Sequence, residues 1–422
     1  MRRTVHLFSI FLFIGMGQSE GQDHPFLSHL SDYIENLQVF EQGQEEGRAY
    51  AIPETHLSLN GQWKFFYSEV PEGIPDDFFE RNFDDRKWDE ITVPSNWEMQ
   101  GYGDPLFRNI STTFALRRPA NAPTDPYEAF RGPQKEAPYT VTPPEVPKEY
   151  NPTGAYRTSF SLPDGWRSQE VFLRFEKVAS ASFVWVNGKE VGYNEGAQEP
   201  AEYNITPFLQ KGNNTIAVLV IKFCDGYYLE GQDYWRLAGI FDDVRVYATN
   251  PVRLFDWQVI TDLDEHYENA ELTLHVLPKS YREGGTGYLI HAQINRAGET
   301  IANLSSQPFD LAGKEKKSIT IRESFEEPLK WTSETPNLYE LTLELLNSKG
   351  KVIDRVRTKF GFKETEIRGN TFYLNGVPVK INGINSHMQH PVSGHTMDEA
   401  TIRKDFELLK QFNFNAVRTS HY

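Results

Sequence analysis

The sequence predicts a mainly β protein of several domains whose last segment changes to alternating strand and helix. Three observations predict this class: the chain has 422 residues, β-forming runs fill most of its length, and residues 363–422 read as strand, helix, strand. Such a length suggests about three domains, each with its own core.

The first domain is predicted over residues 23–250 as a jelly-roll β-sandwich. Continuous β-forming runs such as residues 171–175 and 215–222 favour strands. The Asn187-Gly188 pair is a hairpin signal, because a type I′ turn needs positive φ at both central positions. Residues 117–152 are rich in proline, which has no backbone N–H to donate to a neighbouring β-strand. This run therefore predicts a long surface loop.

The second domain is predicted over residues 251–362 as an immunoglobulin-like β-sandwich. Apolar residues alternate with polar ones from Ala270 to Val276, and again from Leu341 to Leu345. The size suits that fold. This region carries no catalytic constellation, so a spacer or interface role is expected.

Residues 363–422 predict an incomplete α/β domain. A β-run over residues 377–384 precedes a capping box, Thr396 to Glu399, and then a helix whose apolar face includes Ile402 and Phe406. A short strand over residues 415–418 follows. This order predicts a crossover helix between two parallel strands. Two strands alone cannot form a complete sheet or barrel, so the domain is expected to be incomplete.

Charge and targeting signals restrict the partners and the compartment. The net charge of −16, without a basic cluster, excludes nucleic acid as a partner. Residues 1–22 resemble a signal peptide, since basic, apolar and small residues follow in that order; the alternative is a buried N-terminal helix. We expect export to a periplasmic or extracellular location, with no membrane span after removal of the signal. Cys224 is the only cysteine, so no internal disulfide can form.

Polar residues gather where active residues lie in barrels of alternating strands and helices, just past the ends of the strands. His387 follows the first strand and His421 the second, so two imidazoles should share one rim. Alternatives are solvated loop histidines, a zinc site that includes His390, and a serine triad at Ser420, which lacks a nucleophile elbow. The second polar cluster is residues 231–241, where Asp233 precedes Tyr234, Trp235 and Arg236. The Asp233 carboxylate could accept hydrogen bonds from sugar hydroxyls while the aromatic rings pack against the apolar face of the sugar. A structural ion pair between Asp233 and Arg236 is an equal alternative.

At these residues the chain resembles glycoside hydrolase family 2, and within it the large microbial β-galactosidases. The resemblance covers about everything after residue 35. The motifs that carry it, in order, are VPSNWEMQGY (93–102), DPLFRN (104–109), QDYWRLAGIF (232–241), LNG (374–376) with Asn385 and His387, and NFNAVRTSHY (413–422).

The resemblance implies a jelly-roll sugar-binding domain, an immunoglobulin-like domain and the start of a (β/α)8 TIM barrel. By the same resemblance, Asn109 and Asp233 bind substrate, and Asp233 also ligates Na+. His387 and His421 stabilise the transition state. Catalysis is expected to be retaining, through an acid/base Glu and a nucleophilic Glu that lie on later strands and are absent here. The Mg2+ ligands are expected mostly beyond residue 422.

The expected activity is hydrolysis of terminal non-reducing β-D-galactose residues, with a β-galactoside oligosaccharide as partner and a second copy of the chain as a further candidate. Ser386 and Met388 depart from the arginine and glutamate of many relatives, which puts the exact sugar in question. The rival functions are a β-glucuronidase or β-mannosidase of the same family, and a non-catalytic carbohydrate-binding protein. A glucuronidase needs a cationic group for its substrate carboxylate, so Ser386 argues against it.

Overall fold

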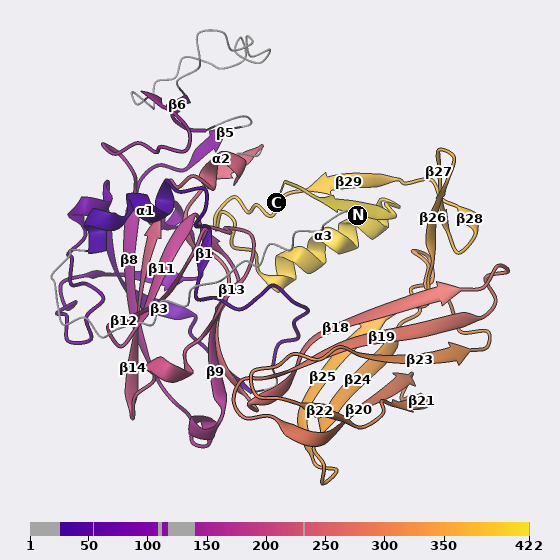
Figure 1. The fold of residues 1–422 in the computed structure, drawn as a ribbon. Helices are drawn as coiled ribbons and strands as arrows, with labels where there is room; N and C mark the ends of the chain where they lie inside the picture. Colours follow the sequence, from indigo (N-terminus) through magenta and orange to yellow (C-terminus); the bar gives the residue numbers. More distant parts are fainter. Residues whose placement is uncertain (1–25, 54, 109–111, 117–139, 231–232, 422) are drawn as a thin grey trace, which may run out of the picture.

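The structure is a computed structural model that describes residues 26–53, 55–108, 112–116, 140–230 and 233–421. Two β-sandwiches and a short α/β unit follow one another along the chain (Figure 1). None of the helices in the described residues is long and apolar enough to cross a membrane. The signal-peptide prediction falls on residues outside those described, as does most of the proline-rich run.

The first sandwich is built from a seven-stranded and a four-stranded sheet. In spatial order the larger sheet contains β1 (Glu41–Gln42), β12 (Lys189–Asn194), β11 (Ala181–Val186), β14 (Asn213–Ile221), β8 (Thr153–Ser161), β3 (Gly61–Ser68) and β4 (Asp89–Val93). The smaller contains β13 (Ala201–Asn204), β9 (Glu170–Phe175), β17 (Val244–Thr249) and β2 (His56–Ser58). Three two-stranded sheets pair β10 (Val178–Ala179) with β16 (Gly239–Ile240), β5 (Leu106–Arg108) with β15 (Tyr234–Arg236), and β6 (Ala115–Leu116) with β7 (Thr140–Val141).

The central strands of this domain are buried on both faces, which explains their continuous apolar runs. Every residue of β9 and β11 is buried. One face packs against the other sheet, while the opposite face of β11 is covered by the segment around α1 (Ser31–Ile34) and by residues near α2 (Tyr227–Glu230). The predicted hairpin at Asn187 and Gly188 is confirmed, with φ of 55° and 79° between β11 and β12.

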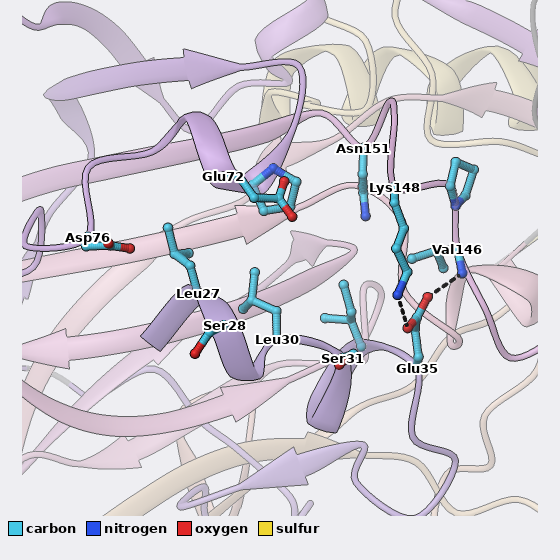
Figure 2. Close-up of a pocket in the computed structure, with 13 residues that line it drawn as sticks. Leu27, Ser28, Leu30, Ser31, Glu35, Glu72, Asp76, Val146, Lys148 and Asn151 are labelled. Atoms are coloured by element: carbon cyan, nitrogen blue, oxygen red, sulfur yellow. Dashed lines mark hydrogen bonds and ion pairs between the residues drawn. The ribbon is translucent and has the colours of Figure 1, made fainter. Parts of the chain in front are cut away.

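A cavity of about 410 Å³ lies beside α1, between this N-terminal segment and the loops at residues 71–76 and 146–151 (Figure 2). Glu35 closes one side, because its carboxylate accepts the Val146 amide at 2.9 Å and pairs with Lys148 at 3.3 Å. None of the predicted site residues lines this cavity.

The second sandwich is the immunoglobulin-like domain. One sheet contains β18 (Val252–Leu263), β19 (Ala270–Ser280) and β23 (Ile319–Phe325). The other contains β21 (Glu299–Ser305), β20 (Gly285–Arg296), β24 (Tyr339–Leu346) and β25 (Val352–Phe360), and β22 (Phe309–Leu311) also pairs with β20. As the alternation predicts, Leu272, Leu274, Leu341 and Leu343 lie in the shared core.

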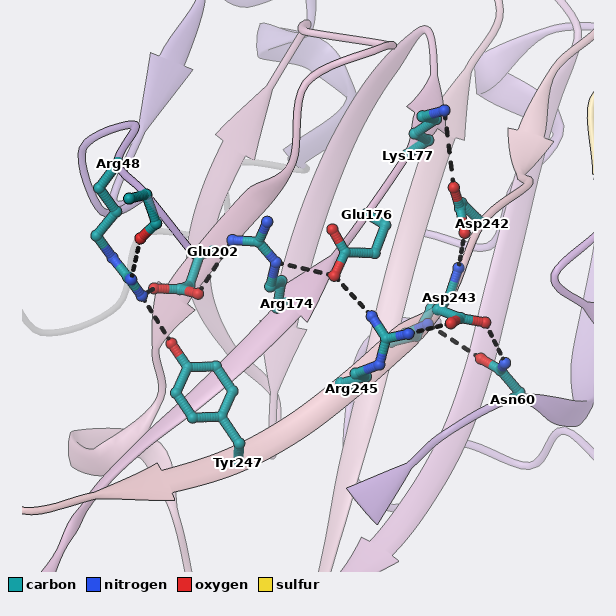
Figure 3. Close-up of polar contacts among 12 residues, drawn as sticks. Arg48, Asn60, Arg174, Glu176, Lys177, Glu202, Asp242, Asp243, Arg245 and Tyr247 are labelled. Carbon is teal, nitrogen blue, oxygen red and sulfur yellow. Dashed lines mark hydrogen bonds and ion pairs between the residues drawn. The ribbon is translucent and has the colours of Figure 1, made fainter. Parts of the chain in front are cut away.

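Arg48, between β1 and β2, and Arg174 of β9 belong to a network of charged side chains in the first sandwich (Figure 3). Arg48 pairs with Glu202 at 2.5 Å and donates to the Phe255 carbonyl at 3.3 Å. Arg174 continues the network from Glu202 to Glu176. Although burial opposes ionisation, Arg48 and the neighbouring arginines hold the pKa of Glu202 below its usual value. The network therefore reaches the second sandwich through the bond from Arg48 to the Phe255 carbonyl.

The last unit differs in part from its prediction. The run at residues 377–384 is not one strand: β28 (Val377–Pro378) joins an antiparallel sheet with β26 (Thr365–Arg368) and β27 (Thr371–Leu374), and β29 (Gly383–Ser386) begins separately. Helix α3 (Glu399–Gln411) then leads to β30 (Ala416–Thr419), which is parallel to β29 as predicted. The helix N-cap is Asp398, whose carboxylate accepts the Thr401 amide at 2.7 Å, so the prediction of Thr396 was wrong.

Candidate functional site

The two predicted histidines lie together past the C-terminal ends of β29 and β30. Ser386 pairs with Thr419 at the end of the parallel ladder, and the Ser420 amide donates to the Ser386 carbonyl at 3.0 Å. The rings of His387 and His421 then follow, with centroids 5.2 Å apart and planes at 56°. Parallel pairing thus brings residues from opposite ends of α3 onto one rim.

Both histidines border spaces that are lined by the first sandwich and its connecting segments. His421 borders a cavity of about 630 Å³ that is otherwise lined by Arg174 and by residues of segments 40–48, 194–202 and 226–230. His387 borders a much smaller space with Lys177, Phe241 and His395. The Nδ1 atom of His387 is buried and has no hydrogen-bond partner among the described residues.

Asp233 is exposed and lies directly before β15. Beside it, the Trp235 and Phe107 rings of the paired strands β15 and β5 meet edge to face with centroids 6.0 Å apart, and both are exposed. Arg236 is buried and donates from Nη1 to the Glu230 carbonyl at 2.9 Å. A carboxylate next to accessible rings suits sugar binding, through hydroxyl donors and an apolar ring face. Asn109, the remaining predicted substrate ligand, lies outside the described residues.

Two buried carboxyls border the larger cavity. Burial, with Asp225 nearby, raises the pKa of Glu195 to about 9. Burial also raises the pKa of Glu230 to about 7, although a hydrogen bond from the Ser180 hydroxyl opposes the shift. Their hydrogen bonds tie both groups to the surrounding sandwich.

Metal ligands are sparse in this region. No cluster of three or more His, Cys, Asp or Glu that could hold an ion occurs in the described residues, so the zinc alternative gains no support. His390 instead accepts the Val392 and Ser393 amides of its own turn, each at 3.3 Å. Asp233 offers a hard oxygen suited to Na+, but a single carboxylate is not a complete site.

Three sequence families match consecutive parts of the chain. The sugar binding domain of glycosyl hydrolases family 2 matches residues 57–132 and 115–251. The family described simply as glycosyl hydrolases family 2 matches 252–363, and the TIM barrel domain of glycosyl hydrolases family 2 matches 365–422. The chain belongs to glycosyl hydrolase family 2. His387 and His421, the histidine rim, therefore lie at the start of the family's barrel domain. The cavity beside His421 is bordered by the sugar-binding domain.

Sequence relatives and solved structures agree on the family. A β-galactosidase of Priestia megaterium is 36% identical over 87% of this chain, and one of Vibrio vulnificus is 38% identical over 86%. The chain spans about a third of the length of these relatives. A β-glucuronidase structure from Bacteroides uniformis superposes with a TM-score of 0.70 at 25% identity, covering 87% of this chain and 40% of that one.

Sequence reasoning missed the residues of the sugar-binding domain that surround His387. Lys177 and Phe241 line its small cavity together with Met388 and His395. Burial, with the Lys177 and Arg236 charges, lowers the pKa of His395 to about 4, so this ring is neutral at neutral pH. Only the motif at residues 232–241 pointed to this surface, because contacts between domains leave no periodic signal.

Proposed function

We propose that the chain, continued through a complete barrel, hydrolyses terminal non-reducing β-D-galactose residues with retention of configuration. The observation that carries this proposal is the pair of imidazoles 5.2 Å apart at the strand ends, with His421 bordering a cavity of the sugar-binding domain. The names of the relatives at 36% and 38% identity favour galactose as the sugar. The acid/base and nucleophilic carboxylates would come from later strands.

His387 and His421 are assigned the role of donors to sugar hydroxyls. Such a hydrogen bond accelerates the reaction only if it strengthens as the ring flattens toward an oxocarbenium ion. Asp233 and Asn109 are assigned to the ground-state sugar. The Asp233 carboxylate can accept from sugar hydroxyls, and the Asn109 side-chain amide can both accept from them and donate to them, whatever the shape of the ring. Sodium at Asp233, with magnesium held mostly by residues past 422, completes the proposal.

A β-glucuronidase is the second candidate, and one observation favours it. The Lys177 ammonium borders the small cavity beside His387, where a uronic acid carboxylate would need a cation. Against this, Lys177 already lies 3.7 Å from the Asp242 carboxylate. We therefore rank galactose first.

A panel of aryl glycosides tests the choice of sugar in the chain with a complete barrel. We expect the highest kcat/KM for the β-galactoside, with the β-glucuronide and β-mannoside at least about tenfold lower, as the net loss of one hydrogen bond of about 1.4 kcal/mol would give. A preference for the β-glucuronide that is lost in Lys177→Met would establish the second candidate. Sugar binding without turnover of any substrate would instead indicate a non-catalytic carbohydrate-binding protein.

The Asp233 assignment has its own test in the same chain. Asp233→Ala should raise KM as well as lower kcat, because its contacts exist before the transition state. The dependence of activity on sodium should weaken in parallel. If KM rises but the sodium dependence of activity is unchanged, Asp233 binds sugar hydroxyls and does not ligate sodium.

Export and self-association are further parts of the proposal. The charged, apolar and small residues at positions 1–22 support removal of a signal during export to the periplasm or medium. Fractionation of the producing cells, with N-terminal sequencing of the mature protein, tests this. Sedimentation of the complete chain tests whether a second copy is a partner.

A further inference from the structure

The loop between β29 and α3, residues 387–398, contacts the sugar-binding domain at the buried side chain of Asn96. Asn96 has no exposed surface, and its Oδ1 accepts the His395 backbone amide at 2.8 Å. Its Nδ2 donates to the Ala238 carbonyl at 3.4 Å. One side chain thus contacts both chain segments that carry predicted site residues, 233–241 and 387–396.

Asn96 is itself held firmly by the sugar-binding domain. It follows β4 and precedes a short 3₁₀ helix, Trp97–Gln100. The Trp97 amide donates to the Ala238 carbonyl at 3.1 Å. The buried Glu98 carboxylate accepts the Ala238 amide at 3.0 Å and pairs with Lys222 at 2.6 Å. Residues 95–98 and 238–240 therefore form one rigid platform.

The loop is shaped to fit this platform. Gly394 has φ of +68°, and an added Cβ would lie 2.7 Å from Asn96 Oδ1 and 2.8 Å from Leu237 Cδ1. A larger residue would therefore be strained and would push the loop away. Nearby, the Thr396 hydroxyl donates to the Phe241 carbonyl at 2.9 Å, which adds a second attachment.

Backbone hydrogen bonds continue from this attachment to His387. Gly394 and His390 exchange two amide-to-carbonyl bonds, of 3.0 and 2.8 Å. The Gln389 amide then donates to the His387 carbonyl at 3.0 Å. The loop is thus a hydrogen-bonded unit with His387 at one end and the Asn96 contact near the other.

We propose that Asn96 is a positioning residue, which holds the His387 loop and the Asp233 segment in one fixed arrangement between two domains. This inference rests on the proposed function, since it assigns Asn96 to the placement of His387 in hydrolysis. Asn96 does not touch substrate. It acts because displacing a catalytic group by about 1 Å is enough to lower turnover strongly.

The test compares two buried asparagines of the sugar-binding domain in the chain with a complete barrel. Asn96→Leu keeps the branched shape of the side chain but leaves the His395 amide without its acceptor and removes one of the two donors to the Ala238 carbonyl, which keeps the Trp97 amide. Asn151→Leu is the matched control: Asn151 is equally buried and makes two 2.9 Å bonds to the Phe223 backbone, both within one domain. We expect kcat to fall about 10- to 100-fold in Asn96→Leu, as for one lost buried hydrogen bond, and to stay within about twofold in Asn151→Leu, although both lower Tm.

A pH profile separates positioning from simple loss of folding. In Asn96→Asp a protonated carboxyl reproduces the acceptor and the donor of the amide, whereas the carboxylate repels the Ala238 carbonyl. The ratio of kcat in Asn96→Asp to that of the wild type should therefore rise as pH falls. A ratio that does not change with pH, or normal kcat in Asn96→Leu, would overturn the inference.

Amide exchange supplies a readout that does not depend on activity. The amides of residues 387–396 should exchange faster in Asn96→Leu and at the wild-type rate in Asn151→Leu. If the wild-type chain hydrolyses no glycoside of the panel, the proposed function fails, whatever the exchange shows. If the wild type is active and exchange over 387–396 is equal in both variants, the positioning role fails alone.

Discussion

Strand β11 and helix α3 both carry apolar side chains, but only those of β11 are buried. Every residue of β11 is buried between the opposite sheet and the covering N-terminal segment. No residue of α3 is buried, and Phe406 is 55% exposed, although its apolar positions recur at the helical period. Amphipathic spacing therefore determines the type of an element, whereas burial depends on what the rest of the fold places against it.

The largest effect is expected on activity, when residues 1–422 are compared with the chain that has a complete barrel. We expect residues 1–422 alone to show no turnover of an aryl β-galactoside above the uncatalysed rate, because general acid and nucleophile supply most of the barrier reduction. The chain with a complete barrel should hydrolyse it. Turnover by the purified 422 residues would mean that carboxylates within them do the chemistry.

Removal of a core ring should give the next largest effect. Phe183 in β11 is fully buried, so Phe183→Ala should cost about 3–5 kcal/mol of unfolding free energy, through lost transfer energy and the cavity left behind. Calorimetry of residues 1–422 measures this in the transition of the first domain. A loss below about 1 kcal/mol would mean that the core around β11 collapses around the missing ring.

The next largest effect is expected for substitutions at His387 and His421, which lie between the first sandwich and the unit that contains α3. In the complete chain, His387→Ala or His421→Ala should raise the activation free energy by about 2–4 kcal/mol and so lower kcat about 30- to 1000-fold, with a smaller change in KM, as for one well-placed transition-state donor. The exposed His266 of the second sandwich provides the control, because His266→Ala should leave both constants unchanged. A higher KM at unchanged kcat would show uniform binding instead.

A smaller effect, dependent on pH, is expected at Glu195. Its pKa of about 9 in the folded chain, against 4.5 in the unfolded chain, means that the folded state holds the proton more tightly. The stability it contributes is therefore complete below pH 4.5 and is lost as pH rises toward 9. Between pH 7 and 8 the wild type should lose up to about 1.4 kcal/mol more than Glu195→Gln. Parallel stability curves from denaturant titration would contradict this.

The smallest effect completes the comparison with β11. Phe406→Ala in residues 1–422 should change stability by less than about 0.5 kcal/mol, since its exposed ring has little packing to lose. We also expect residues 363–422 of this polypeptide to exchange their amides faster than β9, β11 and β14. Strong protection over 383–419 would show that the unit is stable on two strands and a helix.

The sequence by itself determined features that depend on neighbours along the chain. The turn at Asn187 and Gly188 follows from their tolerance of positive φ, and alternation placed Leu272 and Leu343 in a core. The order strand, helix, strand was enough to predict that β29 and β30 are parallel, and hence that His387 and His421 share a rim.

Only the tertiary structure decided features in which distant segments compete for the same groups. Thr396 has the sequence of an N-cap, yet its hydroxyl bonds to Phe241 of the other domain, and Asp398 caps the helix instead. Asn96 meets His395 across 299 positions of sequence. Local patterns encode backbone preference and the direction of burial, but they do not encode which buried amide will find which partner, because that choice is made when the domains pack.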